Sequence, residues 1–170
     1  LRGETLMGRG FVVGPGGKGS NAAIAATRQG ARVALVARVG DDDFGRMALD
    51  LWAREGLDTR AVATGAGEPS GVAQILIYPG GDNSIVVSPG ANAGLDAAQV
   101  GSAGGVLGGC RVMVASFELP LPAVRAALRL GREAGAVTVL NPAPAQPLPP
   151  DLAPLVDVLT PNATEVNALA

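Results

Sequence analysis

The run Gly16-Gly17-Lys18-Gly19-Ser20-Asn21 stands near the start of the 170-residue chain and guides its interpretation. Glycines let a backbone approach a small ligand closely, Lys18 can donate to an oxygen, and Asn21 can both donate and accept. This combination suits a polyol, whose neighbouring hydroxyl groups also donate and accept hydrogen bonds. A tight turn into a helix, with Ser20 as N-cap and Lys18 in solvent, explains the same residues. The spacing alone leaves both interpretations open.

The loop also follows the glycine spacing of the dinucleotide fingerprint, which predicts NAD binding. The glycines concerned are Gly14, Gly16 and Gly19. Asp41 even lies near the offset expected for an acid that binds the ribose. However, residues 8–13 are too polar for the central first strand of such a fold, and Lys18 would stand where the pyrophosphate needs bare backbone. These two conflicts disfavour NAD. A nucleotide P-loop fails because a glycine, rather than Ser or Thr, follows Lys18.

Beyond the loop, the sequence predicts helices and strands in alternation. A helix over 20–29 precedes Gly30, which suits the left-handed position just past a helix end. The apolar run 31–39 predicts a strand buried on both faces. Asp43 can cap a helix over 44–55.

A hairpin signal interrupts the alternation. Residues 71–78 and 84–88 flank the turn residues 79–83, which include two glycines and a proline. Residues 5–13 mix small, polar and β-branched types, which predicts a half-exposed strand leading into the glycine loop. A further short strand is expected near Ala61.

The C-terminal half returns to alternation, with strands over 111–117, 136–140 and 156–160 and a helix over 122–135. This pattern predicts one α/β domain over residues 1–170, with a doubly wound, mostly parallel sheet flanked by helices. Ligands of such folds bind at the carboxyl ends of the strands. Several polar side chains follow strands directly and should project over that edge. They are Glu118, Asn141, Asn162 and Glu165.

Composition excludes several functions. Thirteen basic and fifteen acidic residues give a net charge of -2, which argues against nucleic acid or a membrane surface as partner. The apolar runs are too short to cross a bilayer and no leader is visible, so we expect a soluble, cytoplasmic protein. The absence of histidine excludes imidazole-based catalysis and histidine metal sites. The single cysteine, Cys110, reads as a core thiol.

Segments along the whole chain resemble the ribokinase-like (phosphofructokinase B type) carbohydrate kinases. The glycine loop, with Gly30 and Gly40 further on, matches the N-terminal signature of that family. Four more segments resemble the family in order: Gly40-Asp41-Asp42-Asp43-Phe44-Gly45, Ser88-Pro89-Gly90-Ala91-Asn92, Asn141-Pro142-Ala143-Pro144-Ala145 and Thr160-Pro161-Asn162-Ala163-Thr164-Glu165. Ala22 and Ala163 depart from the usual residues, Gln and Glu, which weakens the choice of substrate more than the choice of family.

The resemblance implies transfer of the γ-phosphoryl group of ATP to a sugar hydroxymethyl group, with Mg²⁺ and a monovalent cation (K⁺) as cofactors. The last two segments favour ribose, phosphorylated at its 5-hydroxyl. The resemblance also assigns the sugar site to Glu118 and to the loop residues Gly17, Lys18, Gly19, Ser20 and Asn21. Asn162 and Glu165 would serve the nucleotide phosphates and the magnesium ion, although they equally form a helix capping box.

The hairpin resembles the family's lid, to which residues 5–13 would add a strand. Ala73, Ile75 and Val87 would face the sugar, because side chains alternate along a strand. Such a lid excludes water from the phosphoryl group. Ordinary hairpin packing explains the same residues. The family also implies a homodimer formed through the lid.

Two family features are not found in the sequence. They are a first strand carrying a sugar-binding Asp and a Gly-Ala-Gly-Asp type loop carrying the catalytic base and the adenine and K⁺ sites. We therefore expect a fragment of a ribokinase-like fold that is inactive alone, with no catalytic residue of its own. The alternatives are a kinase for another sugar or a nucleoside, and a sugar-sensing module without catalysis.

Overall fold

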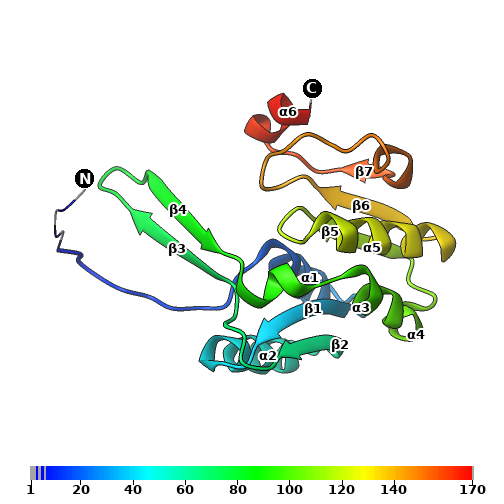
Figure 1. The fold of residues 1–170 in the computed structure, drawn as a ribbon, viewed down its shortest axis with the longest axis horizontal. Coiled ribbons are helices and arrows are strands. Elements are labelled where there is room, and N and C mark those ends of the chain that lie inside the picture. The colour runs from blue at the N-terminus through cyan, green and yellow to red at the C-terminus, as the bar shows by residue number, and fades with distance from the viewer. Residues whose placement is uncertain (1–2, 4, 6, 170) are drawn as a thin grey trace.

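The computed structural model describes residues 3, 5 and 7–169, which form an α/β body with a projecting hairpin (Figure 1). The helices are α1 (Lys18–Arg28), α2 (Asp43–Arg54), α3 (Ala97–Ser102), α4 (Gly104–Leu107), α5 (Leu121–Glu133) and α6 (Ala163–Leu169), with 3-10 turns η1 (Gly90–Gly94) and η2 (Ala153–Leu155). The strands are β1 (Ala34–Gly40), β2 (Asp58–Gly65), β3 (Val72–Ile77), β4 (Asn83–Ser88), β5 (Val112–Ser116), β6 (Val137–Asn141) and β7 (Val158–Leu159).

The strands of the body are all parallel, in two groups. β1 pairs with β2, and β5, β6 and β7 pair in that order. Helices cover both faces: α1 and α2 lie on one side of β1, and α3 and α5 lie on the side turned to the viewer in Figure 1. The predicted doubly wound, mostly parallel α/β architecture is confirmed.

Alternation along β1 explains the two layers. Leu35, Ala37 and Val39 pack in one cluster with Trp52 of α2 and Ala23 of α1. The intervening Val36 packs instead against buried residues of the other layer, around α3 and α5. Because neighbouring side chains of a strand point to opposite faces, one apolar strand is buried between two helical layers.

Trp52 also explains the position of Ser20. The indole Nε1 donates to Ser20 Oγ at 2.8 Å, and both side chains are buried. Helix α1 begins at Lys18, and its N-cap residue is Gly17. The interpretation of Ser20 as N-cap is therefore wrong, because the helix starts two residues earlier and Ser20 satisfies the indole of the core.

The start of α2 differs from the prediction by one residue. Asp42, rather than Asp43, is the N-cap, and its Oδ1 accepts from the Gly45 backbone N–H at 2.8 Å. Asp42 has the extended backbone typical of an N-cap, whereas Asp43 is already helical. Asp43 instead pairs with Arg46 in the first turn.

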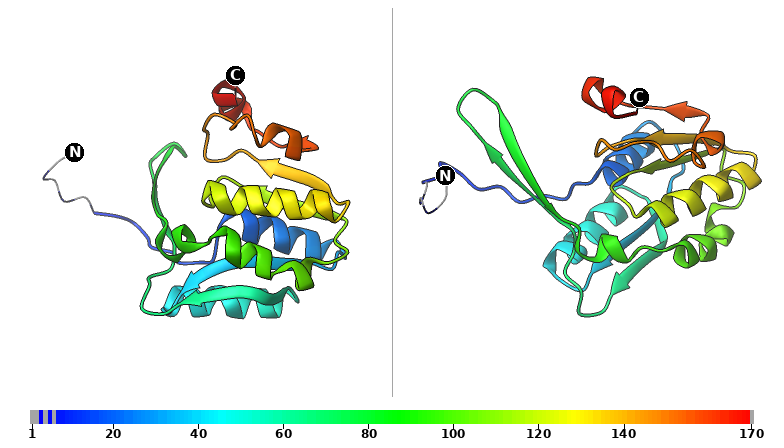
Figure 2. Two further views of the ribbon diagram at one scale, coloured as in Figure 1. Left: turned by 45° about the vertical axis from the view of Figure 1, so that its right-hand side comes forward. Right: turned by 45° about the horizontal axis from the view of Figure 1, so that its top comes forward.

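The hairpin of β3 and β4 is confirmed and projects from the body (Figures 1 and 2). The predicted strand over 5–13 is wrong for the residues described there, which contain no strand. Glycines at 8 and 10 weaken a strand, and Phe11 and Val12 are 88% and 94% exposed. The residues described in this segment are all exposed, so they gain no burial that would hold them extended beside the hairpin.

Cys110 is partly buried and packs with the cluster around Leu107 and Met113. No helix in the described part of the chain is long and apolar enough to cross a membrane.

Candidate functional site

The glycine loop and the end of β5 meet through one short hydrogen bond. The backbone N–H of Lys18 donates to Glu118 Oε2 at 2.6 Å, although the two residues are 100 positions apart. Lys18 is the first residue of α1, whose early N–H groups have no partner within the helix. Glu118 therefore supplies from a distant strand the acceptor that an N-cap side chain normally provides.

Gly17 makes this contact possible. Its backbone has φ 94° and ψ 137°, a conformation that residues with a side chain rarely adopt. A Cβ atom on Gly17 would lie 3.8 Å from Glu118 Oε2, an ordinary contact distance, so the backbone conformation rather than crowding requires glycine here. The loop thus brings bare backbone against a carboxylate, at the end of a helix whose dipole favours negative charge.

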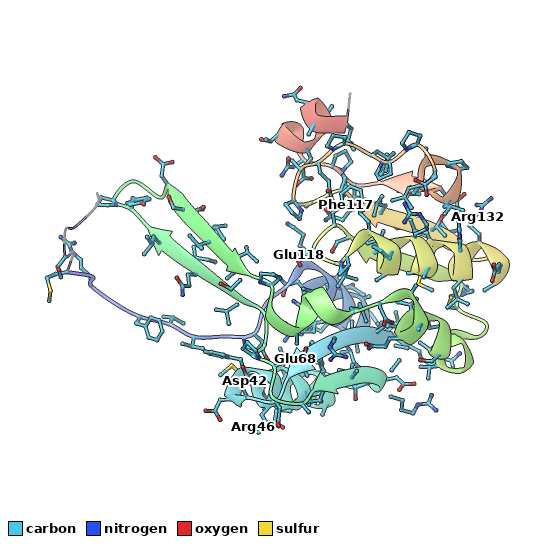
Figure 3. All side chains as sticks on the ribbon, in the orientation of Figure 1. Asp42, Arg46, Glu68, Phe117, Glu118 and Arg132 are labelled. Atoms are coloured by element: carbon cyan, nitrogen blue, oxygen red, sulfur yellow. The ribbon has the colours of Figure 1, made fainter. Side chains whose placement is uncertain are left out.

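Glu118 is exposed, whereas Phe117 directly before it is buried (Figure 3). Phe117 holds the end of β5 in the core, and its backbone N–H donates to the Asn141 carbonyl at 3.2 Å. The Glu118 carboxylate is thus fixed at one oxygen by Lys18, while its remaining lone pairs face outward. The side chains of Lys18 and Asn21 are exposed on the same loop and first turn. The exposed glycine loop thus carries an ammonium and an amide, and its backbone contacts the Glu118 carboxylate.

The predicted loop residues lie in different surroundings. Gly17 and Lys18 join Glu118 directly, and Gly19 and Asn21 are exposed in the first turn of α1. The Ser20 side chain is directed into the core, where it supports the loop through Trp52.

The predicted lid residues share one face of the hairpin. Ala73 lies directly opposite Val87, and Ile75 lies two residues along β3, opposite Ile85. Ile75 and Val87 are 55% and 65% exposed. Figures 1 and 2 show the hairpin projecting away from the body, so this structure does not pack the lid on Gly17 and Glu118.

Asn162 and Glu165 form a reciprocal cap at the start of α6. Glu165 N–H donates to Asn162 Oδ1 at 2.8 Å, while the backbone N–H and Nδ2 of Asn162 donate to the two Glu165 carboxylate oxygens at 2.8 and 2.9 Å. Glu165 is buried. The predicted capping box is present. The structure does not connect this pair with Glu118 by any hydrogen bond among the described residues.

Asn141, at the end of β6, has an unsatisfied side chain. Its Oδ1 is buried without a hydrogen-bond partner among the residues that the structure describes. Unpaired buried polar atoms are uncommon and call for an explanation. The position of Asn141 at a strand end was visible in the sequence, but nothing local indicated that its acceptor would lack a donor.

In the part of the chain that the structure describes, acidic groups do not gather into a metal cage. Over residues 3, 5 and 7–169, no three His, Cys, Asp or Glu side chains are close enough to hold an ion together. The metal role of Glu165 stays a prediction. Mg²⁺ bound through one or two carboxylates, its own waters and nucleotide phosphates needs no such cage.

Comparison with known proteins identifies the family of the chain. The model of the pfkB family of carbohydrate kinases matches residues 1–170. The chain belongs to this family.

Within the pfkB family, the ribokinase of Haemophilus influenzae is 38% identical over 167 residues, which cover 98% of this chain and 55% of the relative. The deoxyribokinase of Salmonella typhi is 35% identical over 168 residues, which cover 98% of this chain and 55% of the relative. The structure of Arabidopsis thaliana ribokinase complexed with ribose and ATP superposes with a TM-score of 0.83 at 25% identity, covering 99% of this chain and 55% of that one. The chain thus spans about half the length of these pfkB relatives.

Proposed function

We propose that the full-length protein containing this chain is a ribokinase, which transfers the γ-phosphoryl group of ATP to the 5-hydroxyl of ribose. The observation that carries the proposal is the contact between the Lys18 N–H and Glu118. It positions a carboxylate beside a glycine loop in a chain that resembles ribokinases over almost all of its length.

The residues of this chain supply binding rather than chemistry. Glu118 would accept hydrogen bonds from two sugar hydroxyls through its free lone pairs, because an ionised carboxylate only accepts. Lys18 would donate to a hydroxyl oxygen, and Asn21 would donate to one hydroxyl and accept from another. The hairpin face with Ala73, Ile75 and Val87 would close over the sugar and exclude water.

On the nucleotide side, Asn162 and Glu165 would lie near the phosphates of ATP. The residues fit a magnesium ion: each oxygen of Glu165 accepts one hydrogen bond and keeps capacity for a second donor, such as a metal-bound water. The unpaired Asn141 Oδ1 is a further acceptor at a strand end, which a water, but not a phosphate oxygen, could satisfy. When bound, Mg²⁺ neutralises charge that develops on the phosphates. The K⁺ site and the cytoplasmic location stay predictions.

The experiment is a coupled assay with the full-length protein, ATP and Mg²⁺, together with calorimetric titration of a panel of sugars and nucleosides. We expect phosphorylation of ribose with the lowest KM of the panel. Sugar binding without phosphoryl transfer would instead identify a sensing module. Residues 1–170 alone should show no turnover, since the catalytic base would come from elsewhere; robust turnover would refute that part.

The 35% identity to a deoxyribokinase supports a second candidate, a kinase for deoxyribose. The two sugars differ by the 2-hydroxyl. A site that hydrogen-bonds this hydroxyl strongly rejects the sugar that lacks it. Comparing kcat/KM for ribose and 2-deoxyribose decides between them.

The exposed apolar face of the hairpin supports a homodimer formed through the lid. Its described residues pair only with one another, which leaves Leu76 and Val86, on the face opposite the predicted sugar-facing residues, largely in solvent. Sedimentation of the full-length protein should give the mass of a dimer, and Val86→Asp should shift it to the monomer. A monomer in the unmodified protein would contradict this arrangement.

A further inference from the structure

One carboxylate and one hydroxyl connect three segments at the base of the hairpin. Ser70 Oγ donates to Asp42 Oδ1 at 2.6 Å, and Ser70 N–H donates to Asp42 Oδ2 at 2.8 Å. Asp42 Oδ1 also accepts from Gly45 N–H, while Ser70 Oγ accepts from Gly40 N–H at 2.9 Å. Asp42 therefore joins the end of β1, the start of α2 and the segment that enters β3. We call this network the hairpin anchor.

The backbone segments of the hairpin anchor are packed too closely for side chains at three of its glycines. A Cβ atom on Gly40 would overlap the backbone of Ser70, and one on Gly45 would overlap the carbonyl of Gly40. Gly90, just after β4, is equally crowded by the Pro69 and Ser70 backbone. The Ala91 N–H donates to the Pro69 carbonyl at 2.8 Å. The chain segments that enter and leave the hairpin are thus held against each other and against Asp42.

Packing changes abruptly above the hairpin anchor. Ser70 and Gly40 are buried, whereas the strands from Ala73 onward are exposed on both faces. Figure 3 shows Asp42 and Glu68 at the junction where the hairpin leaves the body. Since the outer hairpin has little packing of its own, its direction depends on how its base is held.

We propose that Asp42 is a positioning residue, which acts through Ser70 to set the direction from which the lid residues Ala73, Ile75 and Val87 approach the sugar. The inference rests on the proposed function for its catalytic consequence, but not for its geometry. The Ser70 hydroxyl, followed by the N–H groups of Ser70 and Gly45, lowers the pKa of Asp42. The carboxylate is therefore ionised and accepts all three bonds at neutral pH.

Hydrogen exchange tests the geometry in the full-length protein without any substrate. In Asp42→Asn and Ser70→Ala, we expect the amides of 72–77 and 83–88 to exchange about tenfold faster, with 112–116 and 137–141 unchanged. Thr138→Val is the matched control, because it also removes a buried hydroxyl that bridges two segments, in β6. It should accelerate exchange around 137–141 and leave the hairpin unchanged. Uniform acceleration in the Asp42 and Ser70 variants, or no change in the hairpin, would overturn the proposal.

Enzyme kinetics of the same variants tests whether the direction of the lid affects catalysis. If the lid is misdirected, the KM for ribose should rise about tenfold, because lid contacts are lost. More ATP should also be hydrolysed per sugar phosphate formed. In that side reaction a water oxygen forms the bond to the γ-phosphorus, ADP leaves, and phosphate and a proton are released. A lower kcat with unchanged KM and unchanged hydrolysis ratio would contradict a positioning role. If the unmodified protein phosphorylates no sugar, the proposed function fails, while the exchange result still judges the hairpin anchor.

Discussion

Lys18 and Glu118 are 100 residues apart in the sequence, yet the backbone N–H of one donates to the carboxylate of the other at 2.6 Å. The contact joins the first turn of α1 to the end of β5. It brings the glycine loop and the strand-end acid together, through backbone on one side and a side chain on the other.

Glu118→Gln should weaken ribose binding without unfolding the protein. The amide oxygen can still accept from Lys18 N–H, but the charge-assisted bonds to the sugar are lost. We expect a loss of about 2 kcal/mol, close to 30-fold in Kd, by calorimetry of the full-length protein. Glu133→Gln, at an exposed position at the end of α5, is the control and should leave Kd unchanged. Equal affinities for Glu118→Gln and the unmodified protein would remove Glu118 from the site.

Gly17→Ala should destabilise the protein and weaken sugar binding together. The backbone conformation at Gly17 is open to glycine and costs other residues about 1–3 kcal/mol. Gly16→Ala is the neighbouring control, since it has negative φ and open space around its Cβ position. Urea denaturation should give a lower midpoint for Gly17→Ala only. A similar loss in both variants would indicate general sensitivity of the loop.

Gly131→Ala should destabilise the protein although alanine favours helices. A Cβ atom there would lie 2.8 Å from Met113 Cβ and 3.0 Å from Thr138 Cγ2, because α5 packs closely on β5 and β6. Overpacking of this kind costs about 1–3 kcal/mol. Gly101→Ala, in α3 with open space around it, should instead be neutral or stabilising by up to about 1 kcal/mol. Denaturation that shows both variants equally stable would contradict the close packing of α5.

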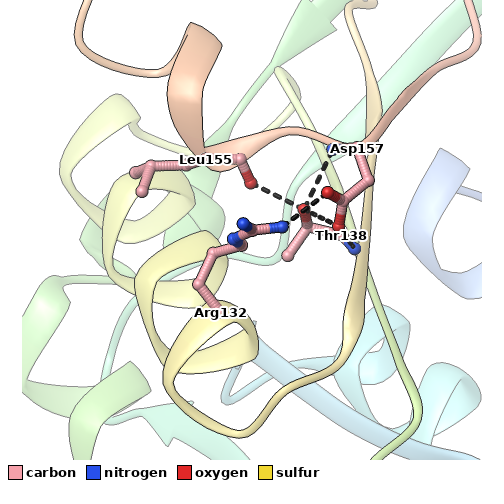
Figure 4. Close-up of polar contacts among 4 residues, drawn as sticks. All are labelled: Arg132, Thr138, Leu155 and Asp157. Carbon is pink, nitrogen blue, oxygen red and sulfur yellow. Dashed lines mark hydrogen bonds and ion pairs between the residues drawn. The ribbon is translucent and has the colours of Figure 1, made fainter.

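Asp157 should contribute to acid sensitivity. The backbone N–H and hydroxyl of Thr138, followed by Arg132, lower the pKa of Asp157 (Figure 4). Because the pKa is lower in the folded state, this stabilisation is complete above the unfolded value of about 4 and is lost as pH falls through the folded value.

Asp157→Asn should therefore lower stability at pH 7 and flatten its decline below about pH 4. Denaturation series between pH 3 and 7 measure this, with the exposed Asp50→Asn as control. Parallel pH profiles for Asp157→Asn and the unmodified protein would show that the hydrogen bonds to Asp157 do not contribute to the pH dependence of stability.

Local patterns predicted most of the fold. Periodicity and cap residues placed β1, α2 and α5 within about three residues, a usual error at element ends. Predictions failed where the deciding partner is distant. Ser20 was predicted to be an N-cap, but its hydroxyl accepts a hydrogen bond from Trp52, which lies 32 residues later in the sequence. The strand expected over 5–13 depended on pairing with the hairpin, and the residues described there do not pair with it.

The candidate site likewise contains features that local sequence predicts and features that depend on distant partners. Glu118 and the glycine loop were identifiable because each carries a local signature, but their hydrogen bond depends on how α1 packs beside β5. The hairpin anchor was missed altogether. Asp42 and Ser70 are 28 residues apart, and neither is unusual in its own segment.

Gly17 limits how this protein can change over evolutionary time. Its backbone conformation strongly disfavours other residues, and the donor of the hydrogen bond beside it is main chain, which substitution does not alter. Single substitutions therefore cannot easily make small changes in the glycine loop at Gly17. The hairpin is different, since its side chains are exposed and can be exchanged with little cost to folding. If the chain binds a sugar as proposed, diversification toward new sugars should begin in the hairpin, while the glycine loop stays the same from one substrate to the next.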